Sequence, residues 1–211
     1  MLTPSLKSVA GVLLIEVLIR TRHLLWAWAW RLLLVLTVLI SQSGFSGDST
    51  AASTWVLIDT HHATLTVMRN DEAVAHFNNI SIGRRGAASI HMQGDDTTPL
   101  GTFRIISRNT ASPYKLFFGL DYPTPAHAEL ALKNGKIEAE HHRLILSAHA
   151  RNQIPPSSTP LGGAIGIHGI GAGSLSVHHQ YNWTNGCIAL DNQQIQEFAR
   201  WVTTGVYVNI Q

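Results

Sequence analysis

The chain has 211 residues, 45% of them hydrophobic, and a formal net charge of +2 at pH 7. Four of its 15 basic residues and one of its 13 acidic residues lie in the first 46 positions, so the remainder carries a charge of about −1. This balance excludes the basic surface of a nucleic-acid-binding domain. A single cysteine, Cys187, excludes an intramolecular disulfide framework. The length suits a leader followed by one domain.

Residues 1–46 have the features of an export leader. Basic residues precede an unbroken apolar run over residues 32–40, and small residues follow the run. We expect either a signal peptide cleaved near Ser43 or a single-pass anchor in the inner membrane, with its basic end in the cytoplasm. Residues 47–54 are then a linker, and with either outcome the domain at 55–211 is exported.

The first part of this domain is predicted to be rich in strands. Residues 55–59 form an apolar strand, and residues 62–68 and 73–81 alternate polar and apolar side chains about a turn, which indicates a hairpin. A further strand is expected at 102–107. Arg84 lies in a basic loop that we interpret either as a solvated turn or as a contact for peptide carboxylates.

An aromatic-rich segment at 114–123 precedes a predicted helix over 125–134 that ends at Gly135. The segment is interpreted equally as a lid over a cleft or as a patch of core, and Tyr114 and Tyr122 are its candidate substrate contacts. Residues 136–147 are expected to be helical in their early part. A second short helix follows residue 191, and residues 206–210 form a closing strand.

The chemistry is concentrated in two glycine-flanked positions. A glycine-rich strand leads to His168-Gly169, and Cys187 follows Gly186 among turn-forming residues. A thiol becomes an effective nucleophile when a neighbouring imidazole accepts its proton and backbone N–H groups stabilise the oxyanion that develops. Glycines beside both residues allow a substrate to approach closely. The sequence therefore predicts a cysteine nucleophile with a histidine base.

These residues resemble the catalytic domain of the L,D-transpeptidases (YkuD-like), over roughly residues 55–211. The family has His-Gly, a spacer of this length and then Ser/Thr-His-Gly-Cys, which corresponds here to His168-Gly169 and to residues 184–187. The sequence Thr-Pro-Leu-Gly-Thr-Phe at 98–103 is similar to the family's Thr-Pro-x-Gly-x-Phe/Tyr segment. Two positions depart from the family: Asn185 replaces a histidine, and Ala189 replaces a frequent arginine.

The resemblance implies a mainly β fold, a YkuD-like β-sandwich of two packed sheets with short helices. It implies that Cys187 attacks a peptide carbonyl and that His168 is the base, with the backbone at Gly169 orienting the ring. The turn Thr184, Asn185 and Gly186 is expected to support the oxyanion. The candidate substrate contacts are Tyr114, Tyr122, Arg84 and Trp183.

The implied activity is acyl transfer on peptidoglycan stem peptides through a thioester, without a cofactor. The acceptor is diaminopimelate, a free D-amino acid or the lysine of an outer-membrane lipoprotein. With water as the acceptor, the same intermediate makes the chain an L,D-carboxypeptidase or endopeptidase. A third hypothesis is a peptidoglycan-binding module without turnover, because of Asn185 and Ala189.

A metal site is the remaining alternative, since the chain has 12 histidines. Three histidine pairs are adjacent in sequence, and adjacent strand residues point to opposite faces, so such pairs rarely bind one ion. A zinc site formed by His142, His149, His168 and Cys187 is left open as a minor alternative.

Overall fold

The computed structural model describes residues 53–211. The expected leader, 1–46, and most of the expected linker, 47–54, lie outside the described residues. Within the described part, no helix combines the length and the apolar character that crossing a bilayer requires.

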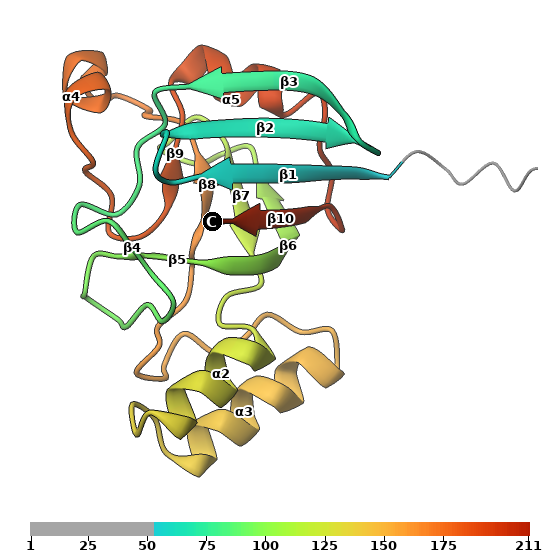
Figure 1. Ribbon diagram of the computed structural model, residues 1–211, viewed down its shortest axis with the longest axis vertical. Helices are drawn as coiled ribbons and strands as arrows, with labels where there is room; N and C mark the ends of the chain where they lie inside the picture. The colour runs from blue at the N-terminus through green and yellow to red at the C-terminus, as the bar shows by residue number, and fades with distance from the viewer. Residues whose placement is uncertain (1–52) are drawn as a thin grey trace, which may run out of the picture. The chain divides into compact units, whose positions relative to one another are not determined.

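Eight strands form one sheet in the order β3–β2–β1–β10–β6–β7–β8–β9, and a separate pair is formed by β4 and β5 (Figure 1). Their bounds are β1 Thr54–Asp59, β2 Thr64–Arg69, β3 Glu72–Asn78, β4 Ala87–Ala88, β5 Thr98–Pro99, β6 Gly101–Asn109, β7 Phe117–Leu120, β8 Gly166–His168, β9 Ile188–Ala189 and β10 Tyr207–Ile210. The predicted hairpin is therefore present as β2 and β3, and the closing strand as β10.

Alternation of side chains explains why the first strands lie where they do. Val56 and Ile58 of β1 and Leu65 and Val67 of β2 have no exposed surface, and the residues between them are partly exposed. Val56 pairs with Val67 across the antiparallel ladder, so the apolar faces of both strands point to the same side of the sheet.

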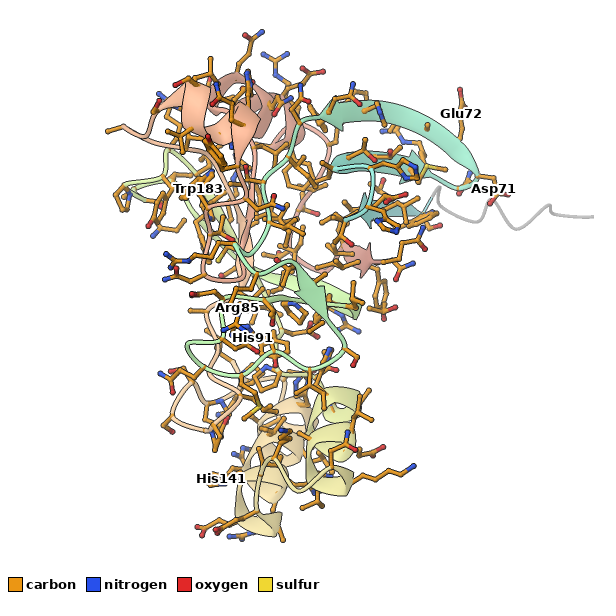
Figure 2. The ribbon with its side chains drawn as sticks, turned by 60° about the vertical axis from the view of Figure 1, so that its left-hand side comes forward. Asp71, Glu72, Arg85, His91, His141 and Trp183 are labelled. Atoms are coloured by element: carbon orange, nitrogen blue, oxygen red, sulfur yellow. The ribbon has the colours of Figure 1, made fainter. Side chains whose placement is uncertain are left out.

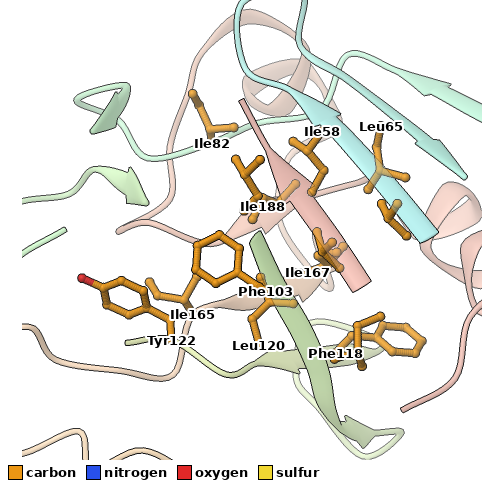
Figure 3. Close-up of a cluster of buried hydrophobic side chains, with 14 of the residues drawn as sticks. Ile58, Leu65, Ile82, Phe103, Phe118, Leu120, Tyr122, Ile165, Ile167 and Ile188 are labelled. Atoms are coloured by element: carbon orange, nitrogen blue, oxygen red, sulfur yellow. The ribbon is translucent and has the colours of Figure 1, made fainter. Parts of the chain in front are cut away.

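The structure has one sheet and not the two packed sheets that were expected, because strand β6 belongs to both halves and joins them. Its first part pairs with β10, and its second part pairs with β7 after a register shift between Ile105 and Ser107. A bulge of this kind bends a strand and increases its twist. One continuous, curled sheet thus supplies both walls of the core, and Figure 3 shows Ile58 and Leu65 from one half with Ile167 and Ile188 from the other.

Four helices accompany the sheet: α2 Pro125–Lys133, α3 Ala139–Ala150, α4 Leu175–Gln180 and α5 Asn192–Phe198. Helices α2 and α3 pack side by side (Figure 1). Thr124 caps α2, and Asp191 forms a capping box with Gln194 at the start of α5. Phe198 of α5 contacts Phe77 of β3 and Phe118 of β7, with ring centroids 6.3 and 5.3 Å away, so it joins both halves of the core.

Two of these helices differ from the prediction of two short helices. Helix α3 continues to Ala150, beyond the early part of 136–147 that was expected to be helical. Helix α4 was not predicted at all. It has six residues, its N-cap is Ser174, and its only buried residue is His178, so it has no apolar stripe for sequence periodicity to detect.

Candidate active site

His168 and Cys187 are brought together by the parallel pairing of β8 and β9. His168 ends β8 and lies opposite Ala189, and Cys187 immediately precedes β9. Both residues line one cavity of about 620 Å³. Of the other sequence-predicted residues, Tyr114, Trp183, Thr184 and Asn185 also line this cavity.

The thiol of Cys187 is held in its neutral form. The residue is only partly exposed, and its Sγ lies 3.6 Å from the carbonyl oxygen of Ala164, to which it donates. Burial raises the pKa of Cys187 to about 11, although a hydrogen bond with the backbone of Gly166 acts in the opposite direction. A thiolate is therefore scarce at neutral pH unless a base removes the proton.

The imidazole of His168 is in the form that such a base requires. Its Nδ1 lies 2.7 Å from the carbonyl oxygen of Gly169. Because a carbonyl can only accept, Nδ1 carries the proton in the neutral ring, and Nε2 has a free lone pair. The side chain is 3% exposed, and this burial lowers the pKa of His168 despite the bond to Gly169. Both partners are thus neutral at rest.

Aromatic rings account for the burial of His168. Its ring centroid lies 4.4 Å from Tyr114, 6.2 Å from Phe117 and 5.8 Å from Trp183. The indole N–H of Trp183 in turn donates to Nδ1 of His178, at 3.2 Å. The short helix α4, which carries His178, thereby holds one wall around the imidazole.

The turn before Cys187 is fixed by its own side chains. Thr184 Oγ1 donates to the carbonyl of Cys187 at 2.7 Å and accepts from the N–H of Gly186 at 3.1 Å. Gly186 has a φ of +135°, and a Cβ there would lie 2.7 Å from the carbonyl oxygen of Thr97. Only glycine fits this position. The N–H of Gly186 is occupied by Thr184, which leaves other donors of the turn to face a ligand.

Thr98 also supports the site. From the sequence it was known only as the first residue of the Thr-Pro-x-Gly motif, without a role of its own. Its buried hydroxyl donates to the carbonyl of Gly186 at 2.9 Å and accepts from the N–H of Gly83 at 2.8 Å. The Thr-Pro-x-Gly segment therefore supports the backbone of the cysteine turn from behind.

Asn185 and Arg84 are in direct contact. The Arg84 guanidinium donates to Oδ1 of Asn185 and forms an ion pair with Asp96, with Nε 3.2 Å from Oδ2. Since arginine can only donate, the oxygen of the Asn185 amide faces Arg84, and its NH₂ group remains available on the other side. Arg84 thus acts on the cavity through Asn185. Ala189, the second departure from the family, is fully buried in β9 and adds no charge.

The prediction that Tyr122 contacts substrate is wrong. Its side chain is 1% exposed, lies in the core beside Phe103 (Figure 3), and does not line the cavity. Its hydroxyl donates to the carbonyl of His91, and burial raises the pKa of Tyr122. The ring therefore packs in the core, against Phe103 and His127. Tyr114, from the same aromatic segment, is 42% exposed and does line the cavity.

Within residues 53–211, no three His, Cys, Asp or Glu side chains are gathered in a way that could hold a metal ion. His149, from the zinc alternative, instead bonds to the carbonyl of Pro123 at 2.9 Å. The pair at 141 and 142 lies on α3, and His141 is well removed from Trp183 (Figure 2).

Several solved structures resemble this chain. A mutant of the helical cell shape determining protein Pgp2 from Campylobacter jejuni is 20% identical, with a TM-score of 0.50 over 77% of this chain and 48% of that one. The L,D-transpeptidase from Mycobacterium smegmatis is 15% identical, with a TM-score of 0.43 over 76% and 59%. That from Stackebrandtia nassauensis is 14% identical, with a TM-score of 0.42 over 82% and 62%.

The chain spans about half the length of the Pgp2 structure, and at 20% identity this likeness shows the fold alone. No curated protein matches the chain. The sequence profile of the YkuD family, the L,D-transpeptidase catalytic domain, matches residues 53–210, and the chain belongs to this family.

Proposed function

We propose that this chain is a cysteine-dependent L,D-transpeptidase that acts on peptidoglycan stem peptides. The observation that carries the proposal is the pair of neutral partners in one cavity, the protonated thiol of Cys187 and a histidine base whose Nε2 has no hydrogen-bond partner within residues 53–211. Because the thiol and the imidazole are both neutral, the resting site holds no buried thiolate or imidazolium. The thiol becomes nucleophilic when His168 takes its proton during attack on a substrate.

In the proposed acylation, the proton of Cys187 moves to Nε2 of His168 as Sγ bonds to the peptide carbonyl carbon. The imidazolium, whose Nδ1–H is held by Gly169, then gives this proton to the leaving amine, and the C–N bond breaks. An acceptor amine attacks the resulting thioester. Its proton passes through His168 to the departing sulfur, which returns both side chains to their neutral state.

The developing oxyanion needs donors close to Cys187. Within residues 53–211, the backbone N–H groups of Asn185 and Cys187 have no hydrogen-bond acceptor, whereas that of Gly186 is occupied. The NH₂ group of Asn185 is also available, because Arg84 holds the oxygen of that amide. We assign these three donors to the substrate carbonyl, where each hydrogen bond strengthens as negative charge develops.

The substrate class comes from the family, whose members act on peptidoglycan peptide stems. We propose a tetrapeptide donor, cut between the L-centre of diaminopimelate and the terminal D-Ala, in the periplasm. Tyr114 and Trp183 provide flat apolar walls for the donor stem. The acceptor is a second diaminopimelate, a D-amino acid or a lipoprotein lysine, and with water the products are those of a carboxypeptidase.

Mass spectrometry of peptidoglycan fragments tests this function. Purified fragments are incubated with wild-type protein and with Cys187→Ala, with and without a D-amino acid. New cross-links or exchanged termini with the wild type alone are expected. Shortened stems alone would instead identify a hydrolase. Unchanged fragments in both samples would contradict both activities and support a peptidoglycan-binding module without turnover.

A further inference from the structure

The indole of Trp183 is held by a hydrogen bond to a buried histidine. Trp183, labelled in Figure 2, lines the cavity that holds Cys187, and its ring centroid lies 5.8 Å from that of His168 at an interplanar angle of 71°. Its N–H donates to Nδ1 of His178 at 3.2 Å, and within residues 53–211 this N–H has no other acceptor. The position of one of the rings that surround the base therefore depends on His178.

His178 is anchored to the strand that follows the nucleophile. It is the buried residue of α4 and is 3% exposed. Oγ of Ser81 lies 2.9 Å from the carbonyl oxygen of His178 and 3.2 Å from that of Tyr181, at the end of α4. The backbone of Ser81 exchanges two hydrogen bonds, of 2.9 and 2.8 Å, with Ala189 of β9. His178 is thus fixed to the strand that begins directly after Cys187.

The bond to Trp183 exists in only one protonation state of His178. An indole N–H can only donate, so Nδ1 must accept with its lone pair, and the proton of the neutral ring then lies on Nε2. In the imidazolium both nitrogens carry a proton, and Nδ1 no longer accepts. Its Nδ1–H then has Oγ of Ser81 as an acceptor, 3.1 Å away. Protonation therefore exchanges Trp183 for Ser81 as the partner of Nδ1.

We propose that His178 is a positioning residue for the acyl transfer proposed above, because only its neutral ring holds Trp183 against His168. The inference rests on that proposed function. Nδ1 of His168 is fixed by the carbonyl of Gly169, but this single bond does not fix the tilt of the ring, which depends on the rings around it. Release of the indole lets the imidazole turn Nε2 away from the thiol, and a displacement of about 1 Å can slow a reaction as much as about 100-fold.

The surroundings of His178 favour the neutral ring at neutral pH. Burial is the main cause that lowers the pKa of His178, and His179 on the same helix and His168 on β8 act in the same direction. Asp191, the N-cap of α5, acts in the opposite direction. Nε2 is buried and has no hydrogen-bond partner within residues 53–211. The neutral ring is therefore fully populated above the ordinary pKa of 6.5 and is lost in mild acid.

Two substitutions separate positioning from structural support. Leucine fills the space of the imidazole without an acceptor, so His178→Leu releases Trp183 at every pH. Asparagine places Oδ1 near the position of Nδ1, so His178→Asn keeps an acceptor that does not titrate. His179→Asn, at an exposed position of the same helix, is the matched control at pH 7.5.

The first readout is the rate of Cys187 acylation by a tetrapeptide stem between pH 5.0 and 8.5. The second does not depend on activity: it is the NMR signal of the Trp183 indole N–H proton, identified by its absence from Trp183→Phe. This signal moves upfield when the hydrogen bond to His178 is lost.

At pH 7.5 we expect His178→Leu to be acylated about tenfold more slowly than wild type, on the scale of one lost hydrogen bond, and His178→Asn to recover most of this rate. His179→Asn should match wild type. Because His168 titrates in wild type and in His178→Asn alike, the ratio of their rates isolates His178. This ratio should be constant above pH 7 and should decrease about tenfold toward pH 5.0. The indole signal should move upfield over the same range in wild type and stay in place in His178→Asn.

A ratio that is constant between pH 5.0 and 8.5, or a His178→Asn variant no faster than His178→Leu, would overturn the role of His178. If wild type is not acylated at all, the proposed function fails and the indole signal decides alone. A wild-type signal that does not move with pH would then overturn the hold of His178 on Trp183, and one that moves only while residue 178 is histidine would support it.

Discussion

Thr98 and Gly186, 88 positions apart in sequence, are joined by a buried hydrogen bond of 2.9 Å from the threonine hydroxyl to the glycine carbonyl. The same hydroxyl accepts from the N–H of Gly83. A single oxygen atom thus links the loop after β3 to the residue before the nucleophile. The geometry of the cysteine turn depends on this link and on the Thr184 bonds together.

Thr98→Val tests this link, because valine keeps the shape and removes the hydroxyl. The N–H of Gly83 and the carbonyl of Gly186 would lose their partner in a buried setting, which should lower the free energy of unfolding by about 1–3 kcal/mol. Acylation should slow as well. Thr102→Val, at an exposed position of β6, is the control. Urea unfolding indistinguishable between Thr98→Val and wild type would contradict the account.

Arg84→Gln should slow acylation by releasing the Asn185 amide. Loss of one charge-assisted hydrogen bond, worth about 1.4 kcal/mol, corresponds to an acylation rate roughly tenfold lower than that of the wild type. Arg85→Gln is the matched control, since the exposed Arg85 has no side-chain contact of this kind among residues 53–211.

The pair Arg84 and Asn185 can also be examined by a double-mutant cycle. If Arg84 acts through Asn185, the substitution Arg84→Gln should add nothing to Asn185→Ala. Additive losses would instead indicate that Arg84 contacts the substrate directly, as one interpretation of the sequence expected.

The pH dependence of thiol reactivity follows from the raised pKa of Cys187. With a value of about 11, the thiolate fraction is small at pH 7. Alkylation by iodoacetamide should accelerate about tenfold per pH unit between pH 7 and 9.5, without a plateau. A rate that is already constant at pH 7 would reveal a preformed thiolate–imidazolium pair.

Stability should decrease in mild acid. Burial lowers the pKa of His127, His168 and His178 below the ordinary value of 6.5. The unfolded chain therefore binds more protons than the folded one as pH decreases through this range, so the stabilisation is complete above pH 6.5 and is lost below it. Thermal unfolding should show a lower Tm at pH 5.0 than at pH 7.5. A Tm that is constant or rises toward pH 5.0 would contradict this.

Local patterns were sufficient for part of the fold. The alternation over residues 62–81 predicted the hairpin of β2 and β3, and the apolar run at 55–59 predicted β1. The curled single sheet was not predictable, because it depends on the bulge in β6 and on pairing between strands far apart in sequence. Helix α4 escaped prediction because only His178 of its six residues is buried.

For the site, glycine-flanked motifs predicted the positions that line the cavity, His168 and Cys187. They could not separate Tyr114 from Tyr122, since both belong to one aromatic segment and only tertiary packing buries the second. Nor could they identify His91, which lines the same cavity from the loop between β4 and β5.

Intact-protein mass spectrometry is the most direct test of the central claim. Wild-type protein, Cys187→Ala and His168→Ala are each mixed with a tetrapeptide stem and no acceptor. The account predicts a covalent adduct on the wild type that maps to Cys187, no adduct on Cys187→Ala, and a much slower one on His168→Ala. An adduct on another residue, or equal rates with and without His168, would contradict it.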